Sequence, residues 1–227
     1  MGTAEEEYIM KKFTKNELKE AMCLYAVTDS AWLNGRTLPE VVEEALEGGA
    51  TFIQIREKHL EYEDFAALAK AVKAVTDRFH VPYVINDEVG IAKLIDADGV
   101  HLGQNDEELT KAREILGPDK IIGVSAHNVE EAVTAEKNGA DYLGVGAVFN
   151  TSTKTDVTDM SRETLRAICD AVSIPVVAIG GIKADNILSL EGTSINGVAV
   201  VSAIFAARDI KEATTDLLEK SKTIVKE

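Results

Sequence analysis

Short apolar runs and longer amphipathic segments alternate along almost all of the 227-residue chain. The apolar runs have the length of buried β-strands and lie at residues 23–29, 50–56, 82–87, 98–103, 120–126, 141–148, 174–181 and 197–202. Several are apolar throughout, which is typical of parallel strands that are covered on both faces. Eight strand–helix units in one chain predict an α/β protein, a (β/α)8 TIM barrel of eight parallel strands with outer helices.

The segments between these runs carry helix signals. The segment at 38–49 has a proline near its start and glycines at its end, and the segment at 62–79 places its apolar residues at helical spacing. Segments 106–117, 128–140 and 161–172 repeat this scheme. An open doubly wound sheet is the alternative, but no GxGxxG follows the first run and no acidic residue closes the second in the dinucleotide-binding manner.

The N-terminal region divides into two parts. Residues 1–13 have no clear period, and we expect them to form a flexible extension. A short helix is predicted at 14–22, because Thr14 is followed three residues later by Glu17, as in a capping box. Residues 14–227 are then expected to form a single barrel domain.

The charge excludes some classes of partner. The chain has 24 Lys and Arg against 39 Asp and Glu, a net charge of −15, whereas nucleic acids and anionic membranes are bound by basic surfaces. No apolar run approaches the ~18 residues of a membrane span, and no leader opens the chain, so a cytoplasmic location is expected. The two cysteines and four histidines have no zinc-site spacing.

Polar residues end the predicted strands, and parallel strands of a barrel end at one rim. Gln54, Arg56 and Lys58 alternate at the end of the second run, so they are expected to face the barrel interior, with Ile53 and Ile55 facing the helices. The other polar strand-end residues are Asn86, Asp87, Asp106, Ser125, His101, His127 and Lys154. Helix capping is an alternative explanation for Asp87 and Asp106 taken singly.

Two anion subsites are predicted at this rim. Gly180 and Gly181 follow the seventh run, and Val201 and Ser202 follow the eighth, the usual place of a barrel phosphate site. The second subsite combines cations with carboxylates, and it contains Arg56, Lys58, Lys154, Asp87 and Asp106. Carboxylates repel an anion unless a divalent metal lies between them, so this pattern predicts a Mg²⁺–diphosphate site. Together the subsites indicate transfer of a group from a pyrophosphate ester to a phosphorylated acceptor.

The motifs resemble those of a known family. The segments "QIREK" (54–58), "VINDEVGIA" (84–92), "DADGVHLGQND" (96–106), "TSTKTD" (151–156) and "AIGGI" (178–182) are similar to those of thiamine-phosphate synthase, also called thiamine-phosphate pyrophosphorylase. The resemblance runs from about residue 20 to the C-terminus. It implies a (β/α)8 barrel that joins 4-amino-2-methyl-5-hydroxymethylpyrimidine diphosphate to 4-methyl-5-hydroxyethylthiazole phosphate. The products are thiamine phosphate and pyrophosphate, and the cofactor is Mg²⁺.

The resemblance also implies roles for individual residues. Asp87 and Asp106 match the Mg²⁺ ligands. The positions that match the family's pyrimidine-diphosphate contacts are Gln54, Arg56, Lys58, Asn86, Ser125 and Lys154. Of these, Arg56, Lys58, Lys154 and Ser125 are expected to be catalytic. The thiazole-phosphate contacts match Thr151, Thr153, Gly181, Val201 and Ser202. One loop departs from the family pattern, since Ala147 and Asn150 stand where the family usually has a proline and a different turn residue.

The expected mechanism is a dissociative substitution, in which the cations and Mg²⁺ offset the charge of the leaving pyrophosphate. Lys154 is expected to belong to a loop that excludes water. Two alternatives stay open: a thiazole tautomerase-like isomerase, which needs neither diphosphate nor metal, and a non-catalytic barrel that only binds phosphorylated ligands. The roles of His101 and His127 stay open too. The partners are expected to be two small phosphorylated substrates, and the resemblance leans towards a homo-oligomer.

Overall fold

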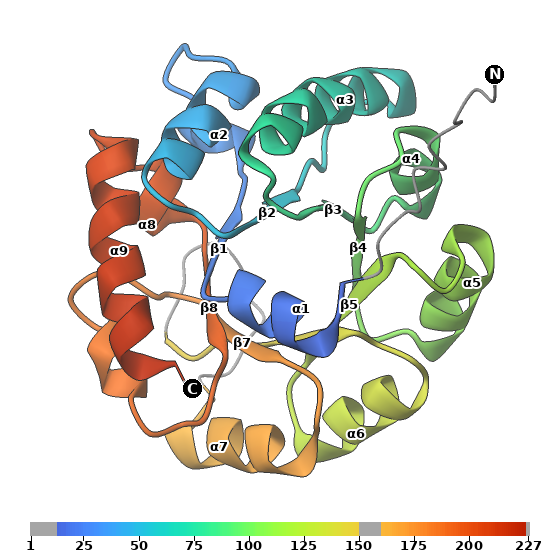
Figure 1. Ribbon diagram of the computed structural model, residues 1–227, viewed down its shortest axis with the longest axis vertical. Coiled ribbons are helices and arrows are strands. Elements are labelled where there is room, and N and C mark those ends of the chain that lie inside the picture. The colour runs from blue at the N-terminus through green and yellow to red at the C-terminus, as the bar shows by residue number, and fades with distance from the viewer. Residues whose placement is uncertain (1–12, 150–159, 226–227) are drawn as a thin grey trace, which may run out of the picture.

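The computed structural model describes residues 13–149 and 160–225, and the fold is a closed barrel of eight parallel strands (Figure 1). Each strand pairs with the next in the sequence, and β1 pairs with β8 to close the ring. The strands are β1 (Leu24–Val27), β2 (Phe52–Ile55), β3 (Tyr83–Asn86), β4 (Gly99–Leu102), β5 (Ile121–Ala126), β6 (Tyr142–Gly146), β7 (Val176–Ile179) and β8 (Gly197–Val200). All eight predicted strands are therefore present, and the predicted barrel is confirmed.

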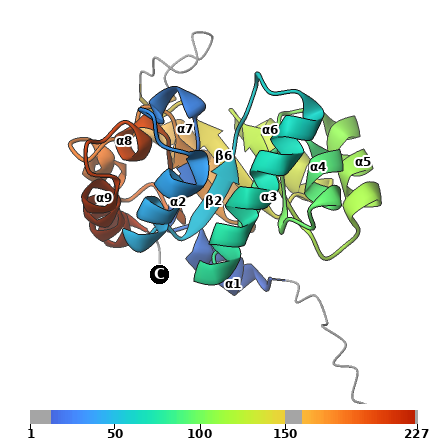
Figure 2. The same ribbon diagram turned by 90° about the horizontal axis from the view of Figure 1, so that it is seen from above.

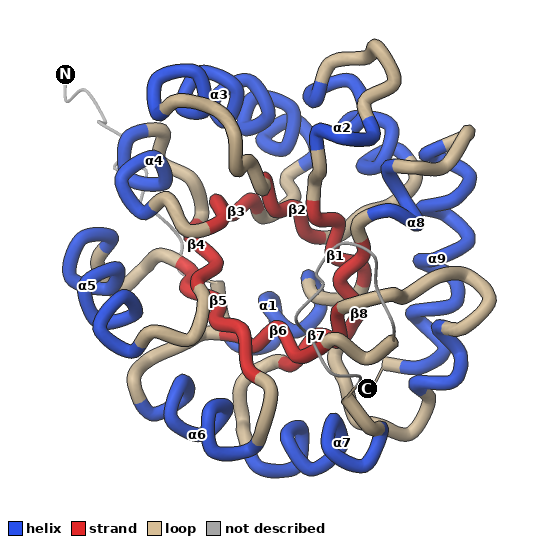
Figure 3. The backbone as a smooth tube through the Cα atoms, turned by 180° about the vertical axis from the view of Figure 1, so that it is seen from behind, coloured by secondary structure: helices blue, strands red, loops and turns tan. Residues whose placement is uncertain are grey.

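Helices form an outer ring around the strands (Figure 3). They are α2 (Leu38–Glu47), α3 (Tyr62–Phe79), α4 (Val89–Leu94), α5 (Asp106–Leu116), α6 (Val129–Lys137), α7 (Arg162–Ala171), α8 (Ser202–Phe205) and α9 (Ile210–Ile224). Two 3₁₀ turns, η1 (Ser30–Trp32) and η2 (Ile187–Leu190), complete the connections. None of the helices in the described part of the chain is long and apolar enough to cross a membrane.

The short helix α1 (Lys15–Ala21) closes the amino end of the barrel, below the strands in Figure 2. It begins with the predicted capping box, in which Thr14 and Glu17 bond each other's backbone N–H. Its Leu18, together with Met22 just beyond the helix, packs in the cluster that fills the barrel interior. Because this end is filled, the open end of the barrel is the rim where the strands finish.

Two hydrophobic clusters lie on the two sides of the strand ring. Phe52 belongs to the inner cluster, whereas Ile53 and Ile55 belong to the larger cluster between strands and helices. Both isoleucines are fully buried. The prediction that Ile53 and Ile55 face the helix layer is thus confirmed, and it follows from the alternation of side chains along β2.

The segments after β7 and β8 differ from the predicted scheme. The segment after β7 forms only the 3₁₀ turn η2, so the seventh unit lacks the α-helix that eight regular units would have. No residue range was predicted for the helix of the eighth unit; α9 takes this place and packs against α2, η2 and β8, where it covers this part of the ring. The sequence 182–196 is short and polar, and a 3₁₀ turn suffices to bury Ile187 and Leu190.

Candidate active site

A pocket of about 150 Å³ opens at the carboxyl end of the barrel. All eight strands, or the residues that directly follow them, contribute to its lining. The polar side chains of the lining are those of Tyr25, Gln54, Arg56, Asn86, His101, Ser125, His127 and Ser202. Most strand-end residues that the sequence singled out therefore meet in one cavity, as expected for a barrel site.

The end of β2 supplies a buried amide and a cation. Gln54 is 4% exposed, and its Nε2 donates a hydrogen bond to the Tyr25 hydroxyl at 2.5 Å. Arg56 lines the pocket, and its backbone N–H donates to the Thr28 hydroxyl at 3.1 Å, which fixes the chain just beyond the strand. Lys58 is exposed and is not part of the pocket lining. The strand ends at Ile55, so strict alternation does not extend to Lys58.

The ends of β3 and β4 are joined through Asp87. The Asp87 N–H donates to the His101 carbonyl at 2.9 Å, and Asn86 Nδ2 donates to Asp87 Oδ2 at 2.6 Å. Asp87 has a φ of 63° and an exposed side chain. Helix α4 has Glu88 as its N-cap, so Asp87 does not cap it. The capping alternative is therefore wrong for Asp87, whose carboxylate lies at the rim beside a pocket-lining amide.

Several predicted site residues cannot be placed. Helix α5 begins at Asp106, a short turn after β4, but the Asp106 side chain lies outside the described residues. Thr151, Thr153, Lys154 and Asn150 also lie outside them. Within the described residues, no group of three or more His, Cys, Asp or Glu side chains could hold a metal ion. A Mg²⁺ site of one or two carboxylates completed by phosphate and water does not require such a group.

The predicted phosphate subsite borders the same pocket. Gly180 and Gly181 have φ values of 102° and 66°, and both line the pocket with Val201 and Ser202. A Cβ on Gly180 would lie 2.5 Å from the Ala147 Cβ, so only glycine fits the close approach of β6 and β7 here. Asn186 Nδ2 donates to the Gly181 carbonyl at 2.9 Å and holds this turn. The four residues predicted for this subsite are thus brought together.

The floor of the pocket contains residues that the sequence reasoning did not select. The Tyr25 and Tyr142 hydroxyls lie 2.8 Å apart, and Tyr142 lies 2.9 Å from His101 Nδ1. His101 Nε2 in turn lies 3.1 Å from the Ser125 hydroxyl. Burial raises the pKa of both tyrosines, so both hydroxyls stay protonated. In the sequence, each tyrosine resembles any buried aromatic residue of a strand.

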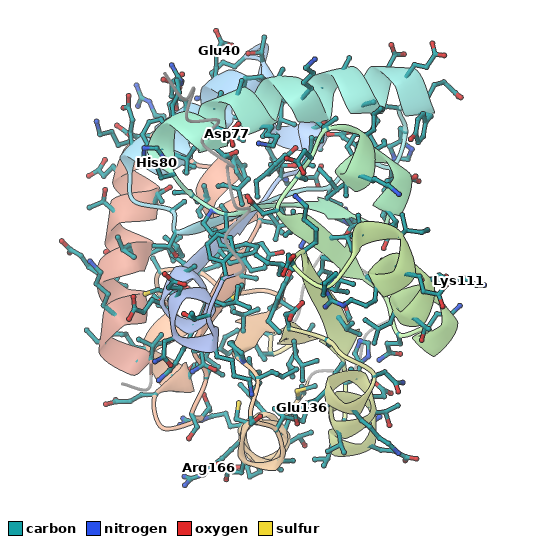
Figure 4. The ribbon with its side chains drawn as sticks, turned by 45° about the vertical axis from the view of Figure 1, so that its right-hand side comes forward. Glu40, Asp77, His80, Lys111, Glu136 and Arg166 are labelled. Atoms are coloured by element: carbon teal, nitrogen blue, oxygen red, sulfur yellow. The ribbon has the colours of Figure 1, made fainter. Side chains whose placement is uncertain are left out.

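His127 and Glu57 lie at the edges of the site. His127 lines the pocket mouth, and its Nδ1 contacts Gln104 and lies 3.3 Å from Glu131 Oε2. Glu57 accepts a hydrogen bond from the Ser30 hydroxyl in η1. Glu57 is not part of the pocket lining. The charged residues Asp77, Lys111 and Arg166 lie on the outer helices α3, α5 and α7 (Figure 4), and none of them lines the pocket.

Comparisons with known proteins agree on one family. A family model described as thiamine monophosphate synthase matches residues 24–204. A thiamine-phosphate synthase of Ruminiclostridium cellulolyticum is 53% identical over 196 residues, which are 86% of this chain and 93% of that protein. One of Clostridium tetani is 48% identical over 194 residues, with 86% and 93% covered.

A solved structure also matches closely. The thiamine phosphate pyrophosphorylase of Pyrococcus furiosus superposes with a TM-score of 0.84 at 40% identity, and the match covers 92% of this chain and all of the other. Both kinds of comparison therefore extend over nearly the whole barrel.

Proposed function

The chain belongs to the thiamine monophosphate synthase family, and from this membership we propose the reaction that its pocket carries out. The activity is that of a thiamine-phosphate synthase, a transferase. The chain transfers the 4-amino-2-methylpyrimidinylmethyl group from its diphosphate to the nitrogen of 4-methyl-5-hydroxyethylthiazole phosphate. Thiamine phosphate and pyrophosphate are the products.

One observation carries this proposal beyond the family match. Residues of the predicted diphosphate subsite, Arg56, Asn86 and Ser125, line the same cavity as Gly181 and Ser202 of the predicted phosphate subsite. A reaction between two phosphorylated substrates needs both anions bound on either side of one reacting centre. A single pocket that joins a cation with a glycine-rich turn supports this arrangement.

The protein's contribution to the reaction is mainly electrostatic. Arg56 binds the diphosphate and offsets the negative charge that grows on it as the C–O bond breaks. Lys58, which is exposed just beyond the pocket, and Lys154 add positive charge for the diphosphate, and the proposed role of Lys154 includes the exclusion of water. Gln54, Asn86 and Ser125 hold the pyrimidine diphosphate so that the thiazole nitrogen meets the exocyclic CH₂. No residue is needed as a nucleophile.

The rim also fits a divalent cation. Asp87 offers an exposed carboxylate, Asn86 engages its Oδ2, and α5 begins with Asp106 at the neighbouring strand end. Oxygen ligands of this kind suit Mg²⁺, which takes one or two carboxylates and completes its shell with phosphate oxygens and water. When bound there, Mg²⁺ supplies positive charge to the diphosphate. Asp87 and Asp106 are therefore the proposed ligands.

The deciding experiment is a pyrophosphate-release assay with the purified protein. Release is expected only when both substrates and Mg²⁺ are present, and a chelator should abolish it, because the leaving group then loses its counter-charge. Conversion of a thiazole phosphate isomer without metal would instead identify a tautomerase-like isomerase. Binding of both substrates without release would identify a non-catalytic phosphate-binding barrel.

Three further properties stay proposals. The partners are two small phosphorylated substrates, since the pocket holds residues suited to each. We also propose that the protein works in the cytoplasm and forms a homo-oligomer, as the family resemblance suggests. Size-exclusion chromatography with light scattering measures the oligomeric state directly.

A further inference from the structure

We propose that four side-chain clamps at the amino end of the barrel divide its eight strands into four two-strand modules that open separately. The modules are β1–β2, β3–β4, β5–β6 and β7–β8. Each clamp is a pair of hydrogen bonds between two residues of one module. The inference depends on bonds at the amino end alone, so it is independent of what the pocket at the other end binds.

A polar side chain directly before each even-numbered strand bonds the odd-numbered strand that precedes it. The acceptor oxygens are those of Thr51, Asp98, Asp141 and Asn196, which stand before β2, β4, β6 and β8. In the same order, they accept from the backbone N–H groups of Leu24 (2.8 Å), Tyr83 (2.9 Å), Ile122 (2.8 Å) and Val176 (2.9 Å). Each of these N–H groups belongs to the first or second residue of its strand. The four clamps thus cover all eight strands.

A second bond joins the same two residues in every clamp. In the β7–β8 clamp, Asn196 Oδ1 accepts from the Val176 N–H, and the Asn196 N–H donates to the Val176 carbonyl at 2.8 Å. The backbone N–H groups of the other clamping residues donate to the carbonyls of their partners in the same way, those of Thr51 (2.9 Å), Asp98 (3.0 Å) and Asp141 (2.8 Å). Both bonds must break before the two strand starts can part.

All four clamping residues are reached through the same local conformation. The residue two positions earlier has a positive φ in each case, and these residues are Gly49 (97°), Asp96 (56°), Gly139 (97°) and Ser194 (64°). The residue between is a buried apolar one, and these residues are Ala50, Ala97, Ala140 and Ile195. The chain therefore enters every even-numbered strand from a left-handed turn. The clamp is a three-residue unit that occurs four times in the chain.

The residues that precede the odd-numbered strands are of a different chemical kind. Pro82 and Pro175 stand before β3 and β7, and a proline side chain has no acceptor atom. Lys120 stands before β5 and carries only N–H donors. Cys23 stands before β1, and its thiol donates to Ser221 of α9 at 3.8 Å. Among the described residues, the boundaries between modules therefore have no clamp of this kind.

This alternation predicts how the amino end of the barrel opens. Within a module, two bonds of one clamp hold the strand starts together. Between modules, the strand starts are joined by backbone bonds such as that from the Ile53 N–H to the Pro82 carbonyl (3.0 Å). Local opening is therefore expected to separate neighbouring modules before it separates the strands within a module. None of the four clamping residues lines the pocket at the other rim, so the clamps leave the site free.

Hydrogen exchange followed by NMR tests the modules in the unmodified protein. The four clamped N–H groups are compared with N–H groups that donate across the module boundaries, those of Ile53, Ile121, Leu143 and Val198. We expect the clamped groups to exchange at least about tenfold more slowly. Equal rates in the two sets, or faster exchange of the clamped groups, would show that the barrel does not open by modules.

Asn196 offers the sharpest variant, because an aspartate can take its place. Asn196→Ala removes the acceptor oxygen, whereas Asn196→Asp keeps one, as Asp98 and Asp141 do in their own clamps. We expect Asn196→Ala to accelerate exchange of the Val176 N–H at least about tenfold more than that of the Leu24 N–H. The thermal midpoint should fall by about 2–4 °C. Asn196→Asp should keep both quantities close to their wild-type values.

The matched control is Asn138→Ala, which truncates an exposed asparagine at the end of α6. This change should leave exchange of the Val176 N–H as it is in the wild type. Equal acceleration at all four clamped N–H groups in Asn196→Ala would mean that only global stability had changed, and the modules would be wrong. Equal exchange in Asn196→Ala and Asn196→Asp would show that the acceptor oxygen has no role. Should Asn196→Ala fail to fold, the wild-type exchange rates decide.

Discussion

Three polar side chains spaced two residues apart, Gln54, Arg56 and Lys58, occupy three different environments. Gln54 is buried in the pocket lining and hydrogen-bonded to Tyr25, Arg56 is half-buried in the pocket wall, and Lys58 is exposed beyond it. The alternation of side chains along the strand determines the positions of Gln54 and Arg56, because they lie on β2 or directly after it. The charge that can act from within the pocket wall at this strand is therefore that of Arg56.

Arg56→Gln tests this conclusion. The amide can still form a hydrogen bond but carries no charge, so binding of the leaving diphosphate in the transition state should weaken. We expect kcat/KM for the pyrimidine diphosphate to fall at least about 100-fold, on the order of 2.7 kcal/mol. Steady-state kinetics measure this ratio.

The matched control is Arg78→Gln. Arg78 is an exposed arginine of α3 that pairs with Glu43 at 2.7 Å on the outer surface. Its replacement should leave kcat/KM close to that of the wild type. Equal losses in the two variants would mean that Arg56 acts through stability alone.

At the scale of elements, the turn after β7 shapes the phosphate side of the pocket. This turn lies against Ala147, which follows β6, and the Gly181 carbonyl is held by Asn186. Helix α8 begins directly after β8 with Ser202 at the same pocket. Backbone N–H groups at such a turn and helix start bind phosphate without any cationic side chain. The conformation of Gly180 is thus expected to affect binding of the thiazole phosphate more than binding of the pyrimidine diphosphate.

Gly180→Ala is expected to raise KM for the thiazole phosphate and lower the midpoint of thermal unfolding. Gly180 has a φ of 102°, which an alanine adopts only with strain. The new methyl group would also lie 2.6 Å from the Ala147 Cα, so the turn must shift. Backbone strain of this kind costs about 1–3 kcal/mol before the overlap is counted. Calorimetry and initial-rate kinetics measure the two effects.

Gly117→Ala is the control that introduces backbone strain without a steric overlap. Gly117 follows α5 with a φ of 84°, and a Cβ there would meet open space. This variant should lose some stability but keep the wild-type KM. If both variants changed KM equally, the turn after β7 would have no special role at the phosphate.

At the scale of the whole molecule, carboxylates outnumber cationic side chains, and the net charge is −15. The outer helices carry many charged groups, and several form exposed ion pairs such as Arg166 with Asp170 and Lys211 with Glu47. Exposed pairs of this kind contribute about 0–1 kcal/mol each. Repulsion among the excess carboxylates acts over the entire surface and opposes the compact state. Electrostatics is therefore expected to lower the stability of the fold at low salt.

Raising NaCl from about 0.01 M to about 0.15 M should raise the thermal midpoint, because the Debye length shortens from about 30 Å to about 8 Å. Differential scanning calorimetry at fixed pH measures the shift. KCl should act equally, since the effect is screening and not ion binding. A midpoint that falls with salt would mean that the ion pairs outweigh the repulsion.

Much of the architecture could be predicted from local patterns. The eight strands, the capping box at Thr14 and the full length of α3 follow from side-chain spacing and cap residues, which depend only on neighbours in the chain. The expected alternation of strands and α-helices was wrong after β7, where the 3₁₀ turn η2 replaces an α-helix and buries the apolar side chains. It did not give the bounds of the helix after β8, because α9 packs on surfaces of α2 and η2 that are distant in sequence.

The sequence by itself determined the class of site: cations, carboxylates and glycines at strand ends, which parallel strands bring to one rim. Only the tertiary structure decided which of them enter the pocket and what supports them. Tyr25 and Tyr142 are 117 residues apart, and their contact exists because closure of the ring aligns β1 and β6 across its interior. Alternation places each side chain inside or outside the barrel, whereas hydrogen bonds across the interior depend on register and on the space left by Gly123 and Gly144.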